Sequence, residues 1–569
     1  MPNSVRPTNP VRSTSFGSSP PVDIGPDPRQ ANARGWLAQA LATRVGDGCL
    51  AVISLPAPLV QPEVFLAALP RANSFVWHPP SGLALAGAGI AESLGTISGP
   101  ESAPEIRARA AAMWRRIVSI ADPTVSAPPP RVIGAVAFST PRRQWGSALA
   151  PDATVFQANP QVTREENPAG SGERSIRRDL PATSSRSLLA EKDWRSMGGA
   201  GGASGNGVAG GNGGNGGNGG NADAIEDPWR ELGSGLFWLP RWCYSREGNR
   251  AWLSLAVPGE LLAVEAERTA ILAEYDRLVS RMLSRIGDAL LDRAGLRPLN
   301  VRKSANLPIE RWTDLIEGIR REISAGRCEK IVAARVMAIE TAEQLDDLSI
   351  LARLAAEAPT STRFAFRGQH TTFLGATPER LLAVNGQHVT TEALAGTVDP
   401  AATDAPGRLL NDPKERAEHA LVVKEIVRRL APLCDRVEAP SFPRLRPLRH
   451  AVHLHTPIEG RLCEPMHIVD LLCALHPTPA VAGVPSAAAI RWITENEPAP
   501  RGLFAGPVGW FDEQGNGEFA VGLRSGIVDG NRAYLFAGAG IVSDSDPTAE
   551  YLETAIKLRP LLEALGIPS

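Results

Sequence analysis

The second half of the chain is a succession of short apolar segments separated by turn residues, and this order constrains the fold more than any other feature. Strand patterns occur from about residue 305 onward without regular strand–helix alternation. Strands joined by tight turns pair in antiparallel fashion, whereas parallel strands need a longer crossover, usually a helix. We therefore expect antiparallel sheets with helices packed outside them, an α+β architecture.

Local signals predict individual elements. The stretch 504–542 predicts three strands, with turns at Gln514-Gly515 and Asp529-Gly530. The stretch 104–121, "PEIRARAAAMWRRIVSIA", predicts one helix. Near the C-terminus, Asp546 can cap a helix whose first position is Pro547, because Asp accepts hydrogen bonds from free N–H groups and proline lacks one.

Shifts in composition divide the chain into segments. Residues 1–34 are rich in Ser, Pro and Arg, and we interpret them as a disordered tail and not as a transit peptide. Residues 150–228 end in a Gly/Asn run that buries too little surface to fold, so we expect a disordered insertion. The insertion interrupts a β-rich N-terminal region formed by residues 35–149 and 229–304. Residues 305–569 contain the candidate catalytic residues.

Charge and composition argue against several classes of protein. The net charge is −2, the chain has no basic run, and only four Tyr are available to stack on bases, so we expect no nucleic-acid partner. No apolar stretch approaches the roughly 18 residues that span a bilayer, so we expect no membrane span. The six cysteines are scattered without a CxxC pair, which is typical of reduced thiols in the cytoplasm.

Two predicted helices each carry an acid pair at i, i+3 spacing. The pairs are Glu415 with Glu418 in "KERAEH" and Glu550 with Glu553 in "AEYLET". Carboxylates from separate helices that meet over a sheet form an oxygen-rich site suited to Mg²⁺, which keeps several waters and takes few protein ligands. The alternative is that these residues form solvated helix faces, with Glu553 paired to Lys557.

Two further charged residues occupy unusual positions. Lys330 lies at the edge of an apolar strand, where loss of water favours the neutral, basic form of a lysine, although a lysine at a strand end can also extend to solvent. Glu379 follows a proline at a strand turn. It is either a functional acid or a surface residue of the turn that pairs with Arg380. His453 and His455 share one strand face, but no third ligand at a fixed spacing supports zinc.

Eight motifs follow one another from "KIVAAR" onward: "KIVAAR", "FLGATPERLL", "EALAGT", "KERAEHALV", "HLHTPIEG", "LHPTPAVAGVP", "GLFAGPVGWFDEQGNGEFAVGLRS" and "LFAGAGIV…AEYLETAIK". Together these motifs make the C-terminal half resemble the chorismate-utilising enzymes, and within them the isochorismate synthases. The resemblance runs in order from about 305 to 568. It implies two large antiparallel β-sheets packed face to face with external helices. Thr377 stands where Ser is common and Ala482 where Gly is common, and neither removes a group that the chemistry needs.

The resemblance also implies roles for single residues. Lys330 resembles the base that activates water and Glu379 the acid that protonates the leaving C4 hydroxyl. The aminating relatives carry glutamine in place of Lys330, so this lysine favours water as the nucleophile. Glu418 and Glu553 resemble the Mg²⁺ ligands, with Glu415 and Glu550 acting through metal-bound water. The residues that resemble the chorismate-binding set are Gly396, His453, Arg524, Gly538 and Lys557.

The activity expected from this resemblance is Mg²⁺-dependent conversion of chorismate to isochorismate by a cytoplasmic monomer without a glutamine amidotransferase subunit. One alternative is a salicylate synthase, which shares the lysine but goes on to expel pyruvate. Another is an inactive chorismate-binding scaffold, in which the Gly/Asn-rich insertion is the working part. The downstream pathway, whether menaquinone, siderophore or salicylate, has no signal in the sequence.

Overall fold

The computed structural model of the chain describes residues 28–71, 73–96, 102–122, 128–138, 227–291, 299–402 and 404–567. Most of the expected tail and insertion, residues 1–27 and 150–226, lies outside the described residues. The first helix, α1 (Pro28–Leu41), begins inside the segment 1–34 that we expected to form a tail. The ordered fold therefore starts earlier in the chain than the sequence pattern indicated.

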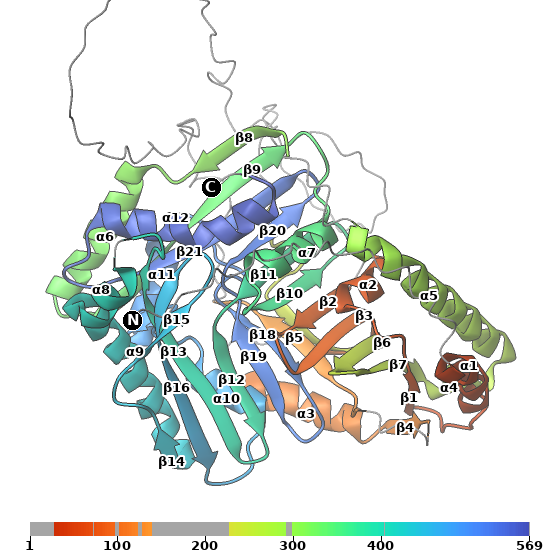
Figure 1. Cartoon of the computed structure of the whole chain (residues 1–569). Coiled ribbons are helices and arrows are strands. Elements are labelled where there is room, and N and C mark those ends of the chain that lie inside the picture. The colour runs from red at the N-terminus through yellow and green to blue at the C-terminus, as the bar shows by residue number, and fades with distance from the viewer. Residues whose placement is uncertain are drawn as a thin grey trace, which may run out of the picture.

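The described residues form 21 strands that hydrogen bonds join into one network, which divides into two sheets at β6 (Figure 1). Every described strand pair is antiparallel except β1–β4. The first sheet contains β8 (Val301–Asn306), β9 (Lys330–Thr341), β17 (Gly483–Val484), β21 (Arg532–Ile541), β20 (Ser525–Asp529), β11 (Thr371–Thr377), β10 (Thr362–Arg367), β2 (Ser74–His78), β3 (Leu83–Gly95), β6 (Gly235–Glu247), β7 (Arg250–Pro258), β1 (Leu50–Pro56) and β4 (Ile117–Ala121). The second contains β5 (Val132–Val136), β18 (Pro507–Phe511), β19 (Gly517–Val521), β12 (Arg380–Asn385), β13 (His388–Val398), β16 (Val452–Leu462), β14 (Cys434–Glu438) and β15 (Arg444–Pro447).

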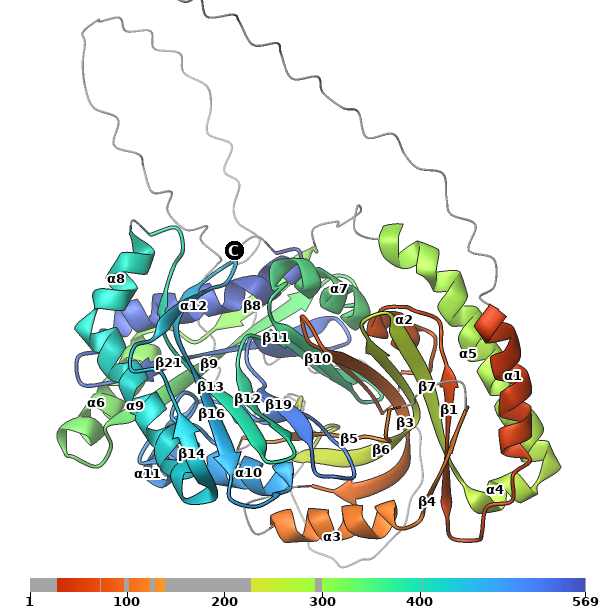
Figure 2. The same ribbon diagram turned by 60° about the horizontal axis from the view of Figure 1, so that its bottom comes forward.

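The strand β6 belongs to both sheets because its two halves have different partners along one edge. Its first residues pair with β5, its later residues pair with β7, and β3 runs along the other edge. Figure 2 shows the strands facing one another across the interior, with helices outside. Aromatic rings from both sheets fill this interior; Phe237 on β6, for example, lies 5.8 Å from Phe511 and 6.1 Å from Phe519, centroid to centroid. The predicted α+β fold of antiparallel sheets with outer helices is confirmed.

The helices cover the outer faces and the ends of the sheets (Figure 1). α6, α7 and α12 pack along the first sheet, α9 and α10 pack on the second, and α1, α2, α4 and α5 lie by β1 to β7. The remaining helices are α2 (Pro62–Ala67), α3 (Ala103–Trp114), α4 (Gly259–Ala263), α5 (Glu265–Leu291), α6 (Ile309–Ser324), α7 (Asp347–Glu357), α8 (Ala405–Asn411), α9 (Pro413–Leu430), α10 (Ile468–Leu475), α11 (Ser486–Asn496) and α12 (Pro547–Ala564).

Two sequence-based element predictions were wrong. The single helix expected over 104–121 ends at Trp114, and "IVSIA" forms β4 beside β1 because its β-branched residues favour an extended chain. The stretch 504–542 contains four strands instead of three, because the chain breaks between β19 and β20. Arg524 lies at this break with a φ of +48°, a left-handed conformation that interrupts strand geometry.

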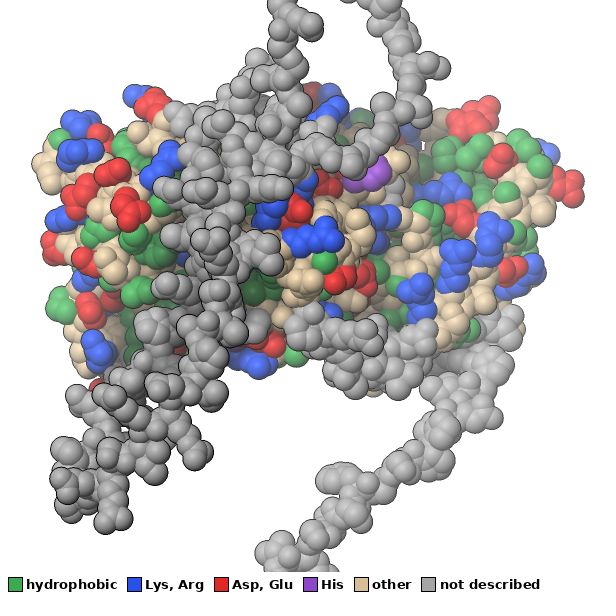
Figure 3. All heavy atoms as spheres, turned by 90° about the horizontal axis from the view of Figure 1, so that it is seen from above, with side chains coloured by type: hydrophobic (Ala, Val, Ile, Leu, Met, Phe, Trp, Pro, Cys, Tyr) green, Lys and Arg blue, Asp and Glu red, His purple; other side chains and the backbone are tan. Residues whose placement is uncertain are grey.

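The described surface carries mixed charge. On the face in Figure 3, basic and acidic side chains alternate over the part formed by described residues. None of the helices in the described ranges combines the length and apolar character needed to span a bilayer.

Candidate active site

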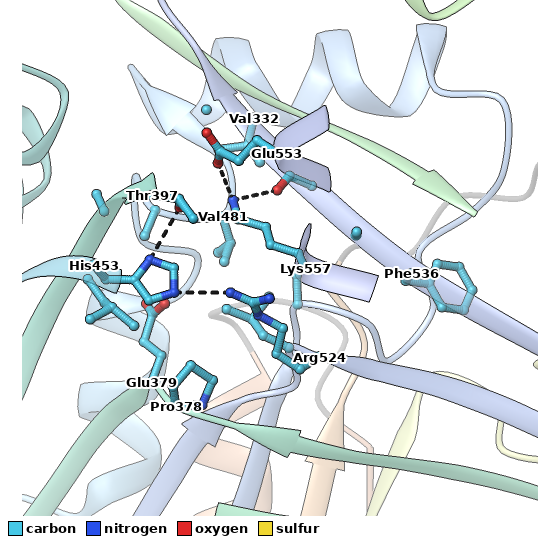
Figure 4. Close-up of a pocket in the computed structure, with 18 of the residues that line it drawn as sticks. Val332, Pro378, Glu379, Thr397, His453, Val481, Arg524, Phe536, Glu553 and Lys557 are labelled. Carbon is cyan, nitrogen blue, oxygen red and sulfur yellow. Dashed lines mark hydrogen bonds and ion pairs between the residues drawn. The ribbon is translucent and has the colours of Figure 1, made fainter. Parts of the chain in front are cut away.

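A cleft lies where β9 and β21 of the first sheet approach β13 and β16 of the second, and it encloses about 710 Å³ of space that is partly open to solvent. Figure 4 shows side chains from both sheets and from α12 pointing into it. Most of the predicted site residues line this cleft, and Lys330, Glu415 and Glu550 lie behind the lining. The predicted residues in the lining are Glu379, Gly396, Glu418, His453, Arg524, Gly538, Glu553 and Lys557.

The turn between β11 and β12 places Glu379 inside the cleft. Its side chain is only 4% exposed, and burial together with the nearby Glu392 carboxylate raises the pKa of Glu379 to about 8. The surface pairing with Arg380 does not occur, because Arg380 bonds to Glu518 at 2.8 Å instead. A carboxyl group in this environment keeps its proton at neutral pH and can donate it.

His453, on β16, contacts the neighbouring strand β13 through one ring nitrogen and Arg524, which directly precedes β20, through the other (Figure 4). Arg524 donates from Nη2 to Nε2 at 3.0 Å, and because arginine cannot accept a hydrogen bond, the ring proton must lie on Nδ1. Nδ1 lies 3.0 Å from the carbonyl oxygen of Gly396, which accepts that proton. Burial, with the Arg524 charge next, lowers the pKa of His453 well below its usual range, so the imidazole is neutral.

Gly396 and Arg524 both adopt left-handed backbone conformations at the cleft. Gly396 has a φ of +78° and lies at a bulge where β13 loses register with β16. Glycine adopts this conformation without steric cost, whereas Arg524 at +48° is strained. In this conformation the Arg524 guanidinium lies at the cleft. Burial lowers the pKa of Arg524 to about 10. Its remaining N–H groups are suited to bind a carboxylate.

The two acid pairs come from the first two turns of α9 and α12. Asp412 caps α9 by accepting from the N–H groups of Lys414 and Glu415, at 2.8 and 3.2 Å. Asp546 caps α12 by accepting from Ala549 N at 2.8 Å, as the sequence predicted. Each cap fixes the start of its helix, so the i, i+3 acids lie on one side of that helix. Glu418 and Glu553 reach the cleft lining.

The four carboxylates converge closely enough to repel one another. Burial, followed by the charges of Glu418 and Glu553, raises the pKa of Glu415 to about 7. Burial and Glu553 raise the pKa of Glu550 as well. Glu550 is 1% exposed and Glu418 is 7% exposed, so these are not the solvated helix faces that the alternative reading required. We call Glu415, Glu418, Glu550 and Glu553 the acid quartet.

Lysine side chains neutralise the acid quartet. Lys330 is 1% exposed at the start of β9, and its Nζ lies 2.9 Å from Glu418 Oε1, so it is buried and does not extend to solvent. Lys557 Nζ donates to Glu553 Oε1 at 2.5 Å and to the carbonyl oxygen of Gly538 at 2.8 Å (Figure 4). The ion pair between Glu553 and Lys557 that the i, i+4 spacing predicts is therefore present, but it lies inside the cleft.

The donor chemistry of the acid quartet fits a hard divalent cation. Within the described ranges, no three His, Cys, Asp or Glu side chains are gathered tightly enough to enclose a metal as they stand. Mg²⁺ needs only one or two carboxylates and keeps its remaining ligands as water. Glu418 and Glu553 both line the cleft and come from facing helices, so they are the residues placed to supply those ligands.

A family model described as chorismate binding enzyme matches residues 221–566. The chain belongs to the chorismate binding enzymes. The matched stretch contains every residue of the cleft lining, so the family assignment and the site geometry concern the same part of the molecule.

Two curated relatives of this chorismate binding enzyme are 40–42% identical to it over aligned stretches of 260 residues. It is 42% identical over 260 residues to the isochorismate synthase MenF of Bacillus subtilis, a stretch that covers 45% of this chain and 55% of the relative. It is 40% identical over 260 residues to the salicylate biosynthesis isochorismate synthase of Pseudomonas aeruginosa, covering 45% and 54%. The aligned part thus spans about half the length of these relatives.

Solved structures extend the likeness to nearly the whole fold. The menaquinone-specific isochorismate synthase MenF of Escherichia coli matches with a TM-score of 0.63 and 23% identity, over 94% of this chain and 100% of that chain. A protein described as a putative 2,3-dihydroxybenzoate-specific isochorismate synthase, DhbC from Bacillus anthracis, matches with a TM-score of 0.58 and 21% identity, covering 89% and 100%. At this identity the likeness establishes the fold alone.

Sequence reasoning missed several residues in or near the cleft. Gly540 leaves room for the Lys330–Glu418 pair, since a Cβ there would lie 2.3 Å from Glu418 Oε1 and 2.8 Å from Lys330 Cε. Its only signal in the sequence is the "AGAG" run, which is compatible with close backbone approach. Lys414 gave no signal beyond its place beside the acid pair in "KERAEH". Glu392 gave no signal, because its proximity to Glu379 arises from strand pairing.

Proposed function

We propose that this protein converts chorismate to isochorismate. The observation that supports this most strongly is the pairing, in one cleft, of a buried carboxyl group that keeps its proton, Glu379, with a buried lysine, Lys330, on the side of the acid quartet. One group can donate a proton while the other accepts one, which an exchange of hydroxyl positions on one ring requires.

The substrate is a dicarboxylate, and the cleft offers cationic groups to hold it. Arg524 and Lys557 both line the cleft, and each has N–H donors beyond those engaged within the protein. The neutral His453 fixes the direction of the Arg524 guanidinium through its Nε2 contact. We assign the carboxylates of chorismate to Arg524 and Lys557, with the backbone at Gly396 and Gly538 approaching the ring closely.

The proposed reaction adds a hydroxyl group from water at C2 of the ring and removes the hydroxyl group at C4. Lys330, in its neutral form, accepts a proton from water as the water oxygen bonds to C2. The ring double bonds shift, the C4–oxygen bond breaks, and Glu379 gives its proton to the departing hydroxyl, which leaves as water. Atoms and charge balance, and each proton transfer contributes about 10²–10⁴ in rate.

We assign Mg²⁺ to Glu418 and Glu553, with Glu415 and Glu550 holding its water ligands. When bound, Mg²⁺ neutralises the acid quartet and attracts a substrate carboxylate. Because water and not ammonia attacks, the proposal needs no glutamine amidotransferase subunit.

The test is incubation of the purified full chain with chorismate and Mg²⁺, with products separated by chromatography. We expect isochorismate at a fixed equilibrium ratio to chorismate, and no product with EDTA or in Glu379→Gln. Salicylate with pyruvate would instead identify a salicylate synthase. Chorismate binding without turnover would indicate a scaffold and contradict the proposal.

A further inference from the structure

Lys414 connects the two helices that carry the acid quartet. It lies in the first turn of α9, directly after Pro413. Its Nζ donates to Glu550 Oε1 on α12 at 2.7 Å and lies 3.4 Å from Glu415 Oε1 on its own helix. The side chain of Glu550 is 2% exposed and that of Lys414 is 26% exposed, so a partly solvated ammonium group neutralises a buried carboxylate.

Lys330 and Lys557 pair with acids that line the cleft, whereas Lys414 pairs with acids that do not. Lys557 lines the cleft and also bonds to the Gly538 carbonyl, and Lys330 pairs with the cleft residue Glu418. Lys414 is outside the cleft lining, and its ammonium group lies between Glu415 and Glu550. These are the two acids that the proposed metal site uses only through water.

We propose that Lys414 is an internal counter-ion that neutralises Glu415 and Glu550 in the metal-free protein and competes with a divalent cation for the acid quartet. The inference rests on the metal site of the proposed function. Two cations cannot both be fully neutralised by the same buried carboxylates, so each weakens the binding of the other.

The geometry gives Lys414 a route out of the acid quartet. A lysine has a flexible four-carbon stem and a compact, strongly hydrated charge, so it loses little on moving to water. Lys414 already has a quarter of its side chain exposed, whereas the Glu550 carboxylate is almost completely buried. Loading of a divalent cation therefore displaces Lys414 toward solvent while the acids stay in place. The lysine sets how much divalent cation is needed.

The test compares Lys414→Met with Lys414→Arg and Lys424→Met in the full chain. Methionine keeps length and apolar character but removes the charge, and arginine restores the charge. Lys424 is an exposed lysine on the same helix. Isothermal titration with Mg²⁺ and with Mn²⁺ gives the cation affinity, and thermal unfolding in EDTA and in excess Mg²⁺ gives the stability with and without cation.

We expect Lys414→Met to bind Mg²⁺ roughly tenfold more tightly than the unchanged chain, because a like charge a few Å from the cation is removed. Its melting temperature in EDTA falls, because the acid quartet loses a counter-ion, and its rise on adding Mg²⁺ is larger. Lys414→Arg and Lys424→Met behave as the unchanged chain.

Equal or weaker Mg²⁺ binding by Lys414→Met, while the unchanged chain binds, would overturn the role of Lys414 alone. An unchanged melting temperature in EDTA would do the same. If the unchanged chain binds neither Mg²⁺ nor Mn²⁺, the counter-ion inference and the metal site of the proposed function both fail. Turnover of chorismate, measured separately, then decides whether the proposed reaction survives without a metal.

Discussion

At the scale of single residues, the charge state of Glu379 depends on its surroundings. Burial comes first and the Glu392 carboxylate second among the causes that raise its pKa to about 8. Glu392 is held in place by His455 and Arg446, each at 2.8 Å. The protonated state of Glu379, which the proposed reaction requires, is therefore favoured by a second acid that does not line the cleft.

The pH dependence of the reaction follows from this arrangement. A raised pKa keeps Glu379 protonated below about pH 8, so kcat/KM for chorismate should fall as the pH rises through about 8. Glu392→Gln removes a charge that raises the pKa of Glu379, so the fall should move to lower pH. Initial rates measured across a pH series test both statements. A falling limb that stays in place, or moves upward, in Glu392→Gln would contradict this role of Glu392.

Gly540 should tolerate no side chain. In Gly540→Ala the new Cβ meets Glu418 and Lys330, and a shift of about 1 Å in such groups costs about 10² in rate. We expect a loss of turnover of that order, with the fold retained, measured as kcat beside circular dichroism. Gly35→Ala on α1 is the control, because its Cβ would meet nothing within 4 Å. Full activity in Gly540→Ala would show that the Lys330–Glu418 pair can relax without loss.

The sequence was most informative where residue type and spacing together imply chemistry. The acids of α9 and α12, Lys330 and Glu379 could all be selected before the structure, and they do meet at one cleft. Lys414 could not be distinguished from a surface lysine, because sequence spacing shows neighbours along a helix but not contacts between helices. The catalytic roles of Lys330 and Glu379 and the metal-binding role of the acids stay predictions.

At the scale of elements, the N-caps of α9 and α12 determine where the acid quartet lies. Their signals, an Asp followed directly by Pro, are local, so the helix starts were predictable. The missed strand β4 shows the opposite case. Its sequence continues an amphipathic helix without a clear stop, and only pairing with β1 selects the extended form. Likewise, the break at Arg524 depends on a conformation that arginine rarely adopts alone.

Removing a cap should affect stability and cation binding separately. Asp412→Ala should cost about 0.5–2 kcal/mol of unfolding free energy, because two N–H groups lose their acceptor. It should also weaken Mg²⁺ binding, since Glu415 loses its fixed position. Asp346→Ala, at the cap of α7, is the matched control with a similar loss of stability. Urea unfolding and calorimetric titration measure the two effects. Equal Mg²⁺ affinity in both variants would contradict the prediction.

At the scale of the whole molecule, the residues on either side of the expected insertion are fixed to each other and to the wall of the cleft. Val136 and Gly235 are register partners in adjacent strands. The Trp229 ring lies 5.5 Å from that of Phe536, which lines the cleft. The described chain therefore closes across the insertion through an ordinary antiparallel pair.

Removal of residues 150–225 should leave activity intact. A short Gly/Ser linker can join the two ends, because their flanking strands already pair and Trp229 is retained. Unchanged kcat and KM for chorismate are the expected result. Trp229→Ala in the full chain is the contrast, and it should raise KM by loosening Phe536. A large loss of turnover in a folded deletion variant would assign the insertion a part in the reaction.

The residues that line the cleft lie between Val332 and Lys557, and within the described part of the chain β1 to β7 contribute only the framework around them. The Escherichia coli neighbour keeps this framework across 94% of the chain at 23% identity. Because β1 to β7 supply no side chain to the cleft lining, their sequences can vary without changing any residue that faces the cleft. Substitutions in these strands should therefore alter the stability of the protein more than the properties of the cleft.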